Sequence, residues 1–302
     1  MLYRNILKLF ALLVFALMVP ISVSAQSFTA TGMYLMGDND SPKFAKSEAR
    51  TDAMRLITEQ AGTYVESYSQ SQDNTLTQDD VTTIAASIVR VTHEEPAVIK
   101  PYGNGQLMCS VTLTAEADTS GLDIKKILEH KTVVQAAEKA RESGRQENNE
   151  LAERYTYANN NERSDIERLV NANDNRDFLL QEAAKAIATG KPGRALKLLK
   201  AHEWEGQYHR NFCFNYLYGV ALYDMGNIKD ARGVFSAIEN NFNQTHPEMF
   251  RVKYYLGMIA YKNGAYPRAY HCLQFAWNNS PQDDDAMRDW YTKAYEAYVD
   301  NM

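Results

Sequence analysis

The hydrophobic and polar positions of this 302-residue chain follow three different patterns. Between positions 28 and 118, runs that alternate apolar and polar residues stand beside runs with an apolar residue every third or fourth position. Alternation at every second position is typical of strands, and a spacing of three or four residues is typical of helices. The chain is therefore predicted to contain an α+β domain over 26–120, a polar helical linker over 121–176 and an all-α region over 177–302.

The α+β domain is expected to hold a mainly antiparallel sheet and two helices. Its first strand is predicted at Phe28–Met36, and its first helix at Ser41, with Pro42 in the first helical position. A stripe of mostly small residues would let this helix lie close to the sheet: Ala45, Ala49, Ala53, Ile57 and Ala61. Gly62 is expected to end the helix, and Tyr64–Ser71 to form a strand.

The second helix of this domain is predicted from Thr77 and Asp80, which resemble a capping box. Three strands are predicted after it, at Val89–Thr92, Ala97–Tyr102 and Leu107–Ala117. Asn104-Gly105 favours a hairpin turn before the last of them. Alternation in that strand predicts an inward face made of Leu107, Cys109, Val111, Leu113 and Ala115.

The first 25 residues differ from the rest and predict a secretory signal peptide. Arg4 and Lys8 precede the apolar run Leu9–Val19, and the small residues before Gln26 fit a cleavage site. A retained anchor is the alternative. Without Arg4 and Lys8 the 32 basic residues become 30 against 38 acidic ones, a formal charge of −8. This balance argues against nucleic acid or an anionic membrane surface as the main partner.

Two segments of the α+β domain resemble a known family. They are ATGMYLMGDNDSPKFAKSEARTDAMRLITEQAG and the final VTLTAEAD. Together with the order of elements over 28–118, they are similar to the N-terminal domain of FlgT-type flagellar H-ring proteins and of related small envelope lipoproteins. The resemblance implies a bacterial protein in the cell envelope that takes part in protein assembly. The chain departs from that family by continuing into helical repeats.

Positions 123–176 are predicted to be helical and very polar, without a sustained heptad. Asn159–Asn161 and Asn171–Asn175 are expected to break the helices. A solvated pair of connecting helices is one interpretation, and a lever or dimerisation helix is the other.

Three segments of the last region repeat one pattern, AAKAIATGKPGRA, GVALYDMGNIKDA and GMIAYKNGAYPRA. Each has a small residue, a glycine seven positions later and an alanine five positions after that: Ala183, Gly190 and Ala195; Gly219, Gly226 and Ala231; Gly257, Gly264 and Ala269. The spacings of 36 and 38 residues predict a solenoid of helix pairs. The small residues should lie where helices touch, and the middle glycines in the turns.

This pattern resembles the tetratricopeptide repeat family over about 178–300, and Pro281 matches the family's terminal proline. A last helix from Asp283–Asp285 to Val299 would cap the solenoid. The resemblance implies a concave face that takes extended peptides, with Leu180 and Ile187 in the first repeat. In the next two repeats it implies a groove lined by Tyr216, Val220, Tyr223, Arg251, Tyr254, Met258, Tyr261 and Lys262. The tyrosines could instead pack against the chain's own polar helix or into the core.

No catalytic or metal-binding pattern emerges from the residue types that usually carry such chemistry. The six histidines form no HExxH motif, Asp38-Asn39-Asp40 lacks the later ligands of a calcium loop, and the glycines form no phosphate-binding motif. Three cysteines allow a Cys213–Cys272 bond, but buried free thiols are favoured. No cofactor, metal or enzyme activity is expected.

The sequence therefore predicts an exported, periplasmic or envelope-associated scaffold that binds a protein or peptide, and that could form a homo-oligomer. A structural component of an envelope assembly, flagellar or secretory, is the second hypothesis. A glycan- or lipid-binding module is the third.

Overall fold

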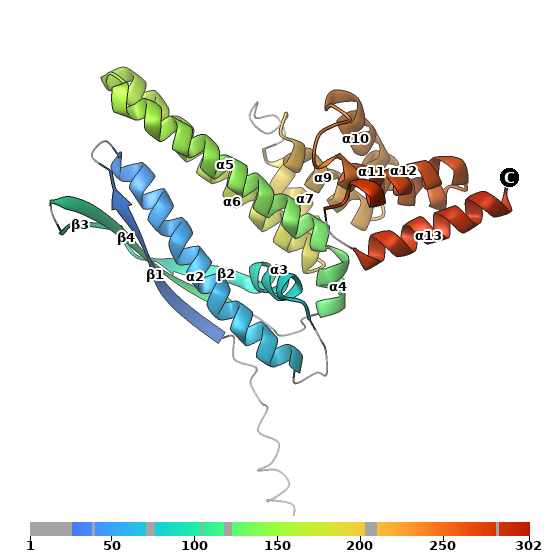
Figure 1. Cartoon of the computed structure of the whole chain (residues 1–302), viewed down its shortest axis with the longest axis horizontal. Helices are drawn as coiled ribbons and strands as arrows, with labels where there is room; N and C mark the ends of the chain where they lie inside the picture. Colours follow the sequence, from blue (N-terminus) through green and yellow to red (C-terminus); the bar gives the residue numbers. More distant parts are fainter. Residues whose placement is uncertain are drawn as a thin grey trace, which may run out of the picture.

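The computed structural model describes residues 26–37, 40–70, 76–103, 105–117, 123–202, 210–281 and 284–302. The N-terminal elements are β1 (Gln26–Met36), α2 (Pro42–Gln70), α3 (Gln78–Ile88), β2 (Val89–Glu94), β3 (Val98–Tyr102) and β4 (Gln106–Ala117). The helices that follow are α4 (Ile124–Glu129), α5 (Lys131–Tyr157), α6 (Asn160–Ala188), α7 (Pro192–Lys200), α9 (Phe212–Asp224), α10 (Ile228–Asn241), α11 (Met249–Lys262), α12 (Tyr266–Asn279) and α13 (Asp285–Asp300). An antiparallel sheet with helices is thus followed by a series of paired helices, as the sequence predicts (Figure 1). The predicted signal peptide lies outside the described residues.

The sheet is built around β4, which pairs antiparallel with β1 along one edge and with β2 and β3 along the other. The predicted inward face of β4 is confirmed from Cys109 onward, whereas Leu107 is 43% exposed. The stripe of small residues on α2 covers this face. A Cβ atom on Gly32 of β1 would lie only 2.0 Å from the Ala49 carbonyl oxygen, so the glycine lets the helix backbone touch the sheet.

The strand predicted at Tyr64–Ser71 is wrong, because α2 runs through Gly62 to Gln70. The stripe of buried residues spaced four apart continues past Ala61 to Val65 and Ser69, so the helix still has a face to bury. The start of α2 is as predicted, with the Phe44 amide donating to Ser41 Oγ at 3.1 Å.

The remaining N-terminal elements follow the prediction closely. The Thr77–Asp80 capping box is confirmed and opens α3. Gly105, at the tip of the predicted hairpin, has a φ of 83°, while Asn104 lies outside the described residues.

The polar linker is a helical hairpin of α5 and α6, with α2 running between it and the sheet (Figure 1). Asn159 caps α6 with Glu162 in a capping box, so a break does occur between the helices there. The second predicted break, at Asn171–Asn175, is wrong, because α6 continues through it to Ala188. The predicted boundary between linker and repeats therefore falls inside one helix.

The repeat geometry agrees with the predicted turn and contact positions. Gly190, Gly226 and Gly264 have φ values of 73°, 79° and 72°, which only glycine adopts readily. A Cβ atom on Gly257 would lie 2.5 Å from Leu273 Cγ, so α11 and α12 meet at this glycine. Ala183, Ala195, Ala231 and Ala269 are fully buried. Asp284 accepts from the Met287 amide at 3.0 Å and begins the predicted last helix.

Cys109, Cys213 and Cys272 are free and buried, so the interpretation as buried thiols is confirmed. In the part of the chain that the structure describes, no helix is long and apolar enough to cross a membrane.

Candidate functional site

The predicted groove residues of the repeats divide into a covered group and an accessible group. Five of them are buried, with exposures of 0% to 7%: Tyr216, Val220, Arg251, Tyr254 and Met258. Leu180 and Ile187 of the first repeat are also fully buried. Tyr223 and Tyr261 are half-buried, and Lys262 is exposed. The implied groove residues are therefore divided between the two alternatives that the sequence left open.

The beginning of α5 covers Tyr216 and Arg251 of the first group. The Tyr216 hydroxyl lies 3.4 Å from Thr132 Oγ1, and Arg251 Nη1 donates to the Thr132 carbonyl oxygen at 2.6 Å. Glu248 joins the same cluster, because its carboxylate accepts from Arg251 Nε and from Lys139 Nζ, each at 2.5 Å. For these residues, packing against the chain's own polar helix is what the structure shows.

The accessible group lies at the ends of α9 and α11. Lys262 Nζ donates to the Tyr223 hydroxyl at 2.5 Å and lies 4.6 Å from the centre of that ring. Tyr261 contacts Trp290 of α13 edge to face, with ring centres 5.6 Å apart. Aromatic rings with polar tips and a neighbouring cation form a surface suited to binding another chain. We call Tyr223, Tyr261 and Lys262 the open repeat surface.

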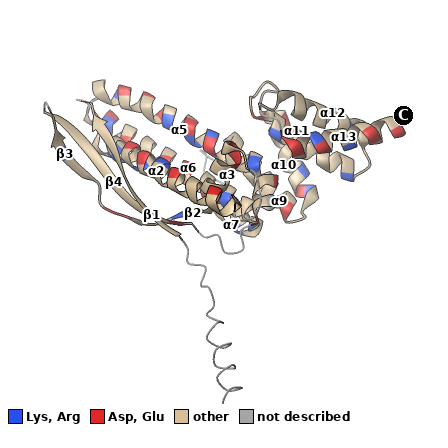
Figure 2. Ribbon diagram, turned by 60° about the horizontal axis from the view of Figure 1, so that its bottom comes forward, with Lys and Arg blue, Asp and Glu red and all other residues tan. Residues whose placement is uncertain are grey.

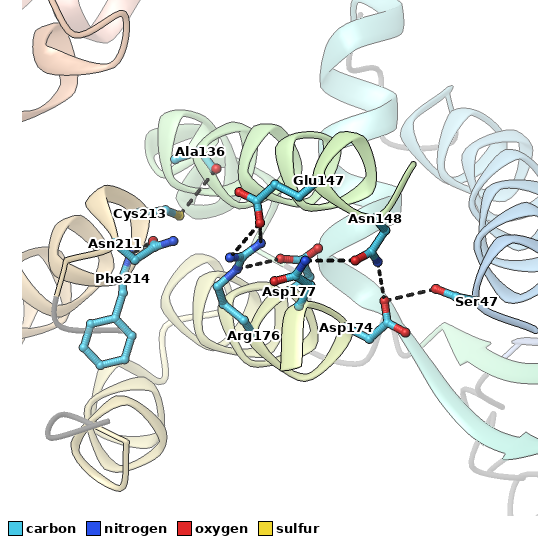
Figure 3. Close-up of polar contacts among 11 residues, drawn as sticks. Ser47, Ala136, Glu147, Asn148, Asp174, Arg176, Asp177, Asn211, Cys213 and Phe214 are labelled. Atoms are coloured by element: carbon cyan, nitrogen blue, oxygen red, sulfur yellow. Dashed lines mark hydrogen bonds and ion pairs between the residues drawn. The ribbon is translucent and has the colours of Figure 1, made fainter. Parts of the chain in front are cut away.

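Sequence reasoning missed a cleft between α2 and the α5–α6 hairpin. It holds a cavity of about 1190 Å³ lined mostly by charged and polar side chains. Asp174 of α6 accepts from Ser47 Oγ of α2 and from Asn148 Nδ2 of α5, each at 3.0 Å. Figure 3 shows these side chains converging from the three helices. A polar linker helix gives no sequence signal for this, because the partners are far apart in the chain.

The two hairpin helices approach closely at Gly144 of α5. A Cβ atom there would lie 2.2 Å from Asp177 Oδ2 and 2.8 Å from Arg176 Nη2. Arg176 bonds both Asp177 and Glu147, each at 3.2 Å (Figure 3). The glycine therefore makes the space that this ion-pair cluster occupies.

Burial controls the protonation of the carboxyl groups in this cleft. It raises the pKa of Asp177 to about 7, although Arg176 acts in the opposite direction. Burial also raises the pKa of Asp174 and of Glu48, which Arg145 approaches at 3.3 Å. Three acids with raised pKa values thus lie where the sheet domain meets the hairpin. Such a cluster marks either a functional site or a structural ion-pair network.

A second cavity of about 930 Å³ continues from the first and is more apolar. Both cavities share wall residues from α2, α5 and α6, including Arg50, Gln135 and Phe178. Lys185 of α6 lines the second cavity, and burial lowers its pKa to about 8.

Within the described ranges, the side chains of Cys213 and His246, which could act as nucleophile and base, each contact other groups. Burial raises the pKa of the Cys213 thiol to about 12, and its Sγ donates to the Ala136 carbonyl oxygen at 3.4 Å (Figure 3). His246 stacks on Phe212 with ring centres 4.2 Å apart, and burial lowers its pKa. Among the described residues, no group of three or more histidine, cysteine, aspartate or glutamate side chains could hold a metal ion.

No family model, curated protein or solved structure matches this chain. The resemblances to FlgT-type proteins and to tetratricopeptide repeats therefore stay predictions drawn from the sequence.

Proposed function

We propose that this protein is an exported, non-enzymatic scaffold that binds a protein or peptide partner on its open repeat surface. The observation that carries the proposal is the accessible group of Tyr223, Tyr261 and Lys262, which comes from two successive repeats. The polar helix α5, which covers Tyr216 and Arg251, leaves these three residues accessible. A cell-envelope location is proposed from the first 25 residues alone.

The chemistry of the open repeat surface favours a partner with an apolar side chain and a nearby negative charge. The two tyrosine rings supply apolar area at a small cost in conformational entropy. Lys262 supplies the positive charge, and its short contact with Tyr223 fixes its position. Arg251, which the sequence also placed here, is held inside by Glu248 and does not contribute.

Site-specific photocrosslinking in cells of the source organism tests this proposal. The photoreactive residue p-benzoylphenylalanine would replace Tyr261 in one variant and Tyr223 in another. Tyr157 is the matched control, because it is a tyrosine with 91% exposure at the far end of the hairpin. We expect one discrete crosslinked product at Tyr223 and Tyr261 that is missing at Tyr157. Adding Lys262→Glu should reduce the yield of this crosslinked product in the Tyr261 variant.

Two results would contradict the scaffold proposal. One is the absence of any discrete product at Tyr223 and Tyr261 when the protein is folded and exported. The other is the same product at Tyr157, which would mean that the open repeat surface has no special role.

A structural role in an envelope assembly is the second candidate, and the sheet favours it. Its uncovered face exposes Met33, Leu35, Val98 and Tyr102, with exposures between 41% and 55%. Strands β1 and β3 carry almost no charge in Figure 2, although charges on exposed strands normally prevent sheets from associating. Light scattering would show an oligomer that Leu35→Lys disrupts if this role is correct, and an unchanged monomer if it is not.

A further inference from the structure

The second cavity has the size and the wall chemistry of a small-molecule site. Its volume of about 930 Å³ lies between α2, α3, β2 and the α5–α6 hairpin. Ligand sites in proteins measure about 300–1,000 Å³ and are mostly apolar with a few polar groups. Its apolar walls include Met54, Val81, Val89, Val134 and Phe178. Phe178 is 55% exposed, which is unusual for a phenylalanine and places an open aromatic ring in the cavity wall.

Most charged residues of the wall already have an opposite charge within ion-pair distance. The pairs are Arg50–Glu94, Arg55–Glu59, Arg141–Glu138, Glu182–Arg194 and Asp79–Lys131, at 2.6 to 3.2 Å. Glu66 lies exposed to solvent. These side chains therefore have little unused charge to offer a ligand.

Lys185 is different. Its ammonium has no hydrogen bond or ion pair with any residue in the described ranges, although the residue is half-buried. Burial lowers its pKa to about 8, and Arg90, Arg194 and Lys191 add repulsion that Glu182 only partly offsets. Arg90 also lines the cavity, and its ion pair with Glu116 is long at 4.0 Å. A negative charge in the cavity would relieve both the repulsion and the loss of hydration.

We propose that this cavity binds one amphipathic carboxylate, with the carboxylate on Lys185 and Arg90 and the apolar chain along Val81 and Phe178. An uncharged apolar molecule would leave the lysine without a partner, and a cationic one would increase the repulsion. The cavity is separate from the open repeat surface, so the carboxylate and the protein partner would bind at different places on the chain.

Fluorescence titration of the full mature chain with dansylated undecanoic acid tests the assignment. We expect saturable one-to-one binding by the wild-type protein. Lys185→Met keeps the length of the side chain and removes its charge, so affinity should fall at least about tenfold. Lys197→Met is the control, because Lys197 is exposed on α7 and does not line the cavity. Its affinity should match that of the wild type.

Two further measurements separate the ligand site from a folding effect. The methyl ester of the probe should bind wild-type protein as weakly as the acid binds Lys185→Met. The acid should also protect Lys185, but not Lys197, from acetylation, as read by mass spectrometry. The assignment is overturned if the wild type shows no saturable binding, if Lys185→Met binds as tightly as wild type, or if acid and ester bind equally.

Discussion

Replacing Gly219 by alanine probes the contact that defines each helix pair. Gly219 of α9 faces Phe235 of α10, and a Cβ atom there would lie 2.6 Å from Phe235 Cε1 and 2.9 Å from Cζ. Carbon atoms in good contact are about 3.5–4.0 Å apart. The phenyl ring has no room to withdraw, because it is fully buried and stacks on Tyr255 with ring centres 5.1 Å apart.

Two opposing effects set the expected magnitude of this change. Alanine is favoured over glycine inside a helix by about 1 kcal/mol. Overpacking a core costs about 1–3 kcal/mol, and an overlap with a rigid ring belongs at the upper end. We therefore expect Gly219→Ala to lower the free energy of unfolding by about 1–2 kcal/mol.

A second helical glycine provides the matched control. Gly233 of α10 is exposed, and a Cβ atom there would meet nothing within 4 Å. In Gly233→Ala only the higher helix propensity of alanine should act, without overpacking. This variant should therefore raise the free energy of unfolding by up to about 1 kcal/mol. The same substitution should thus change the free energy of unfolding in opposite directions at two glycines of one repeat.

Urea unfolding followed by far-ultraviolet circular dichroism measures both variants. Combining Gly219→Ala with Phe235→Leu should recover part of the loss, because the smaller side chain removes the overlap. Equal stability of Gly219→Ala and Gly233→Ala would refute the reasoning, since it would mean that α9 and α10 do not meet at this glycine.

Two other predictions follow from the backbone and from the buried carboxyl groups. Gly264→Ala should cost about 1–2 kcal/mol in the same urea assay, because an alanine is strained at a φ of 72°. Asp177 has a pKa of about 7 in the folded chain against an ordinary value of 3.8, so the folded chain binds its proton more tightly than the unfolded chain does. The free energy of unfolding should fall as the pH rises from about 4 through about 7, and Asp177→Asn should flatten that profile in urea titrations across this range. An unchanged slope in the variant would assign the dependence to other groups.

The sequence predicted the helix pairs well because their constraints are local and recur. A turn that needs a positive φ requires glycine, and a close helix contact requires a small residue, so Gly226 and Gly219 mark their positions directly. The capping box at Thr77 and the alternation of β4 are local signals of the same kind.

The wrong helix boundaries were predicted where a local sequence signal was outweighed by packing against segments that are far away in the chain. Gly62 was expected to end α2. The helix continues because Val65 and Ser69 extend its stripe of buried residues beyond that glycine. The asparagine-rich stretch around Asn173 was expected to break a helix. It forms part of a polar network instead, because Asn173 Nδ2 donates to Asn148 Oδ1 of α5 at 2.9 Å.

The same limit explains why the two cavities were not foreseen and why the sequence left open whether the repeat face is exposed or covered. Lys185 and Phe178 look like an ordinary lysine and an ordinary core phenylalanine until α2 and β2 are placed opposite them. Tyr216 and Arg251 look like groove residues until Thr132 of α5 is placed against them. Each case needs contacts between segments that are many residues apart, and a single sequence does not carry that information.

The continuity of α6 changes how the parts of this protein can act on one another. One helix of 29 residues, roughly 43 Å long, carries Asp174 against α2 at one point and Lys185 in the second cavity at another. Its last turns are also the first helix of the first repeat, where Ala183 is fully buried. The second half of the predicted linker is therefore continuous with the first helix of the repeats. A molecule that enters the second cavity would contact the same helix that supports the repeats, so its binding would also stabilise the first repeat against unfolding.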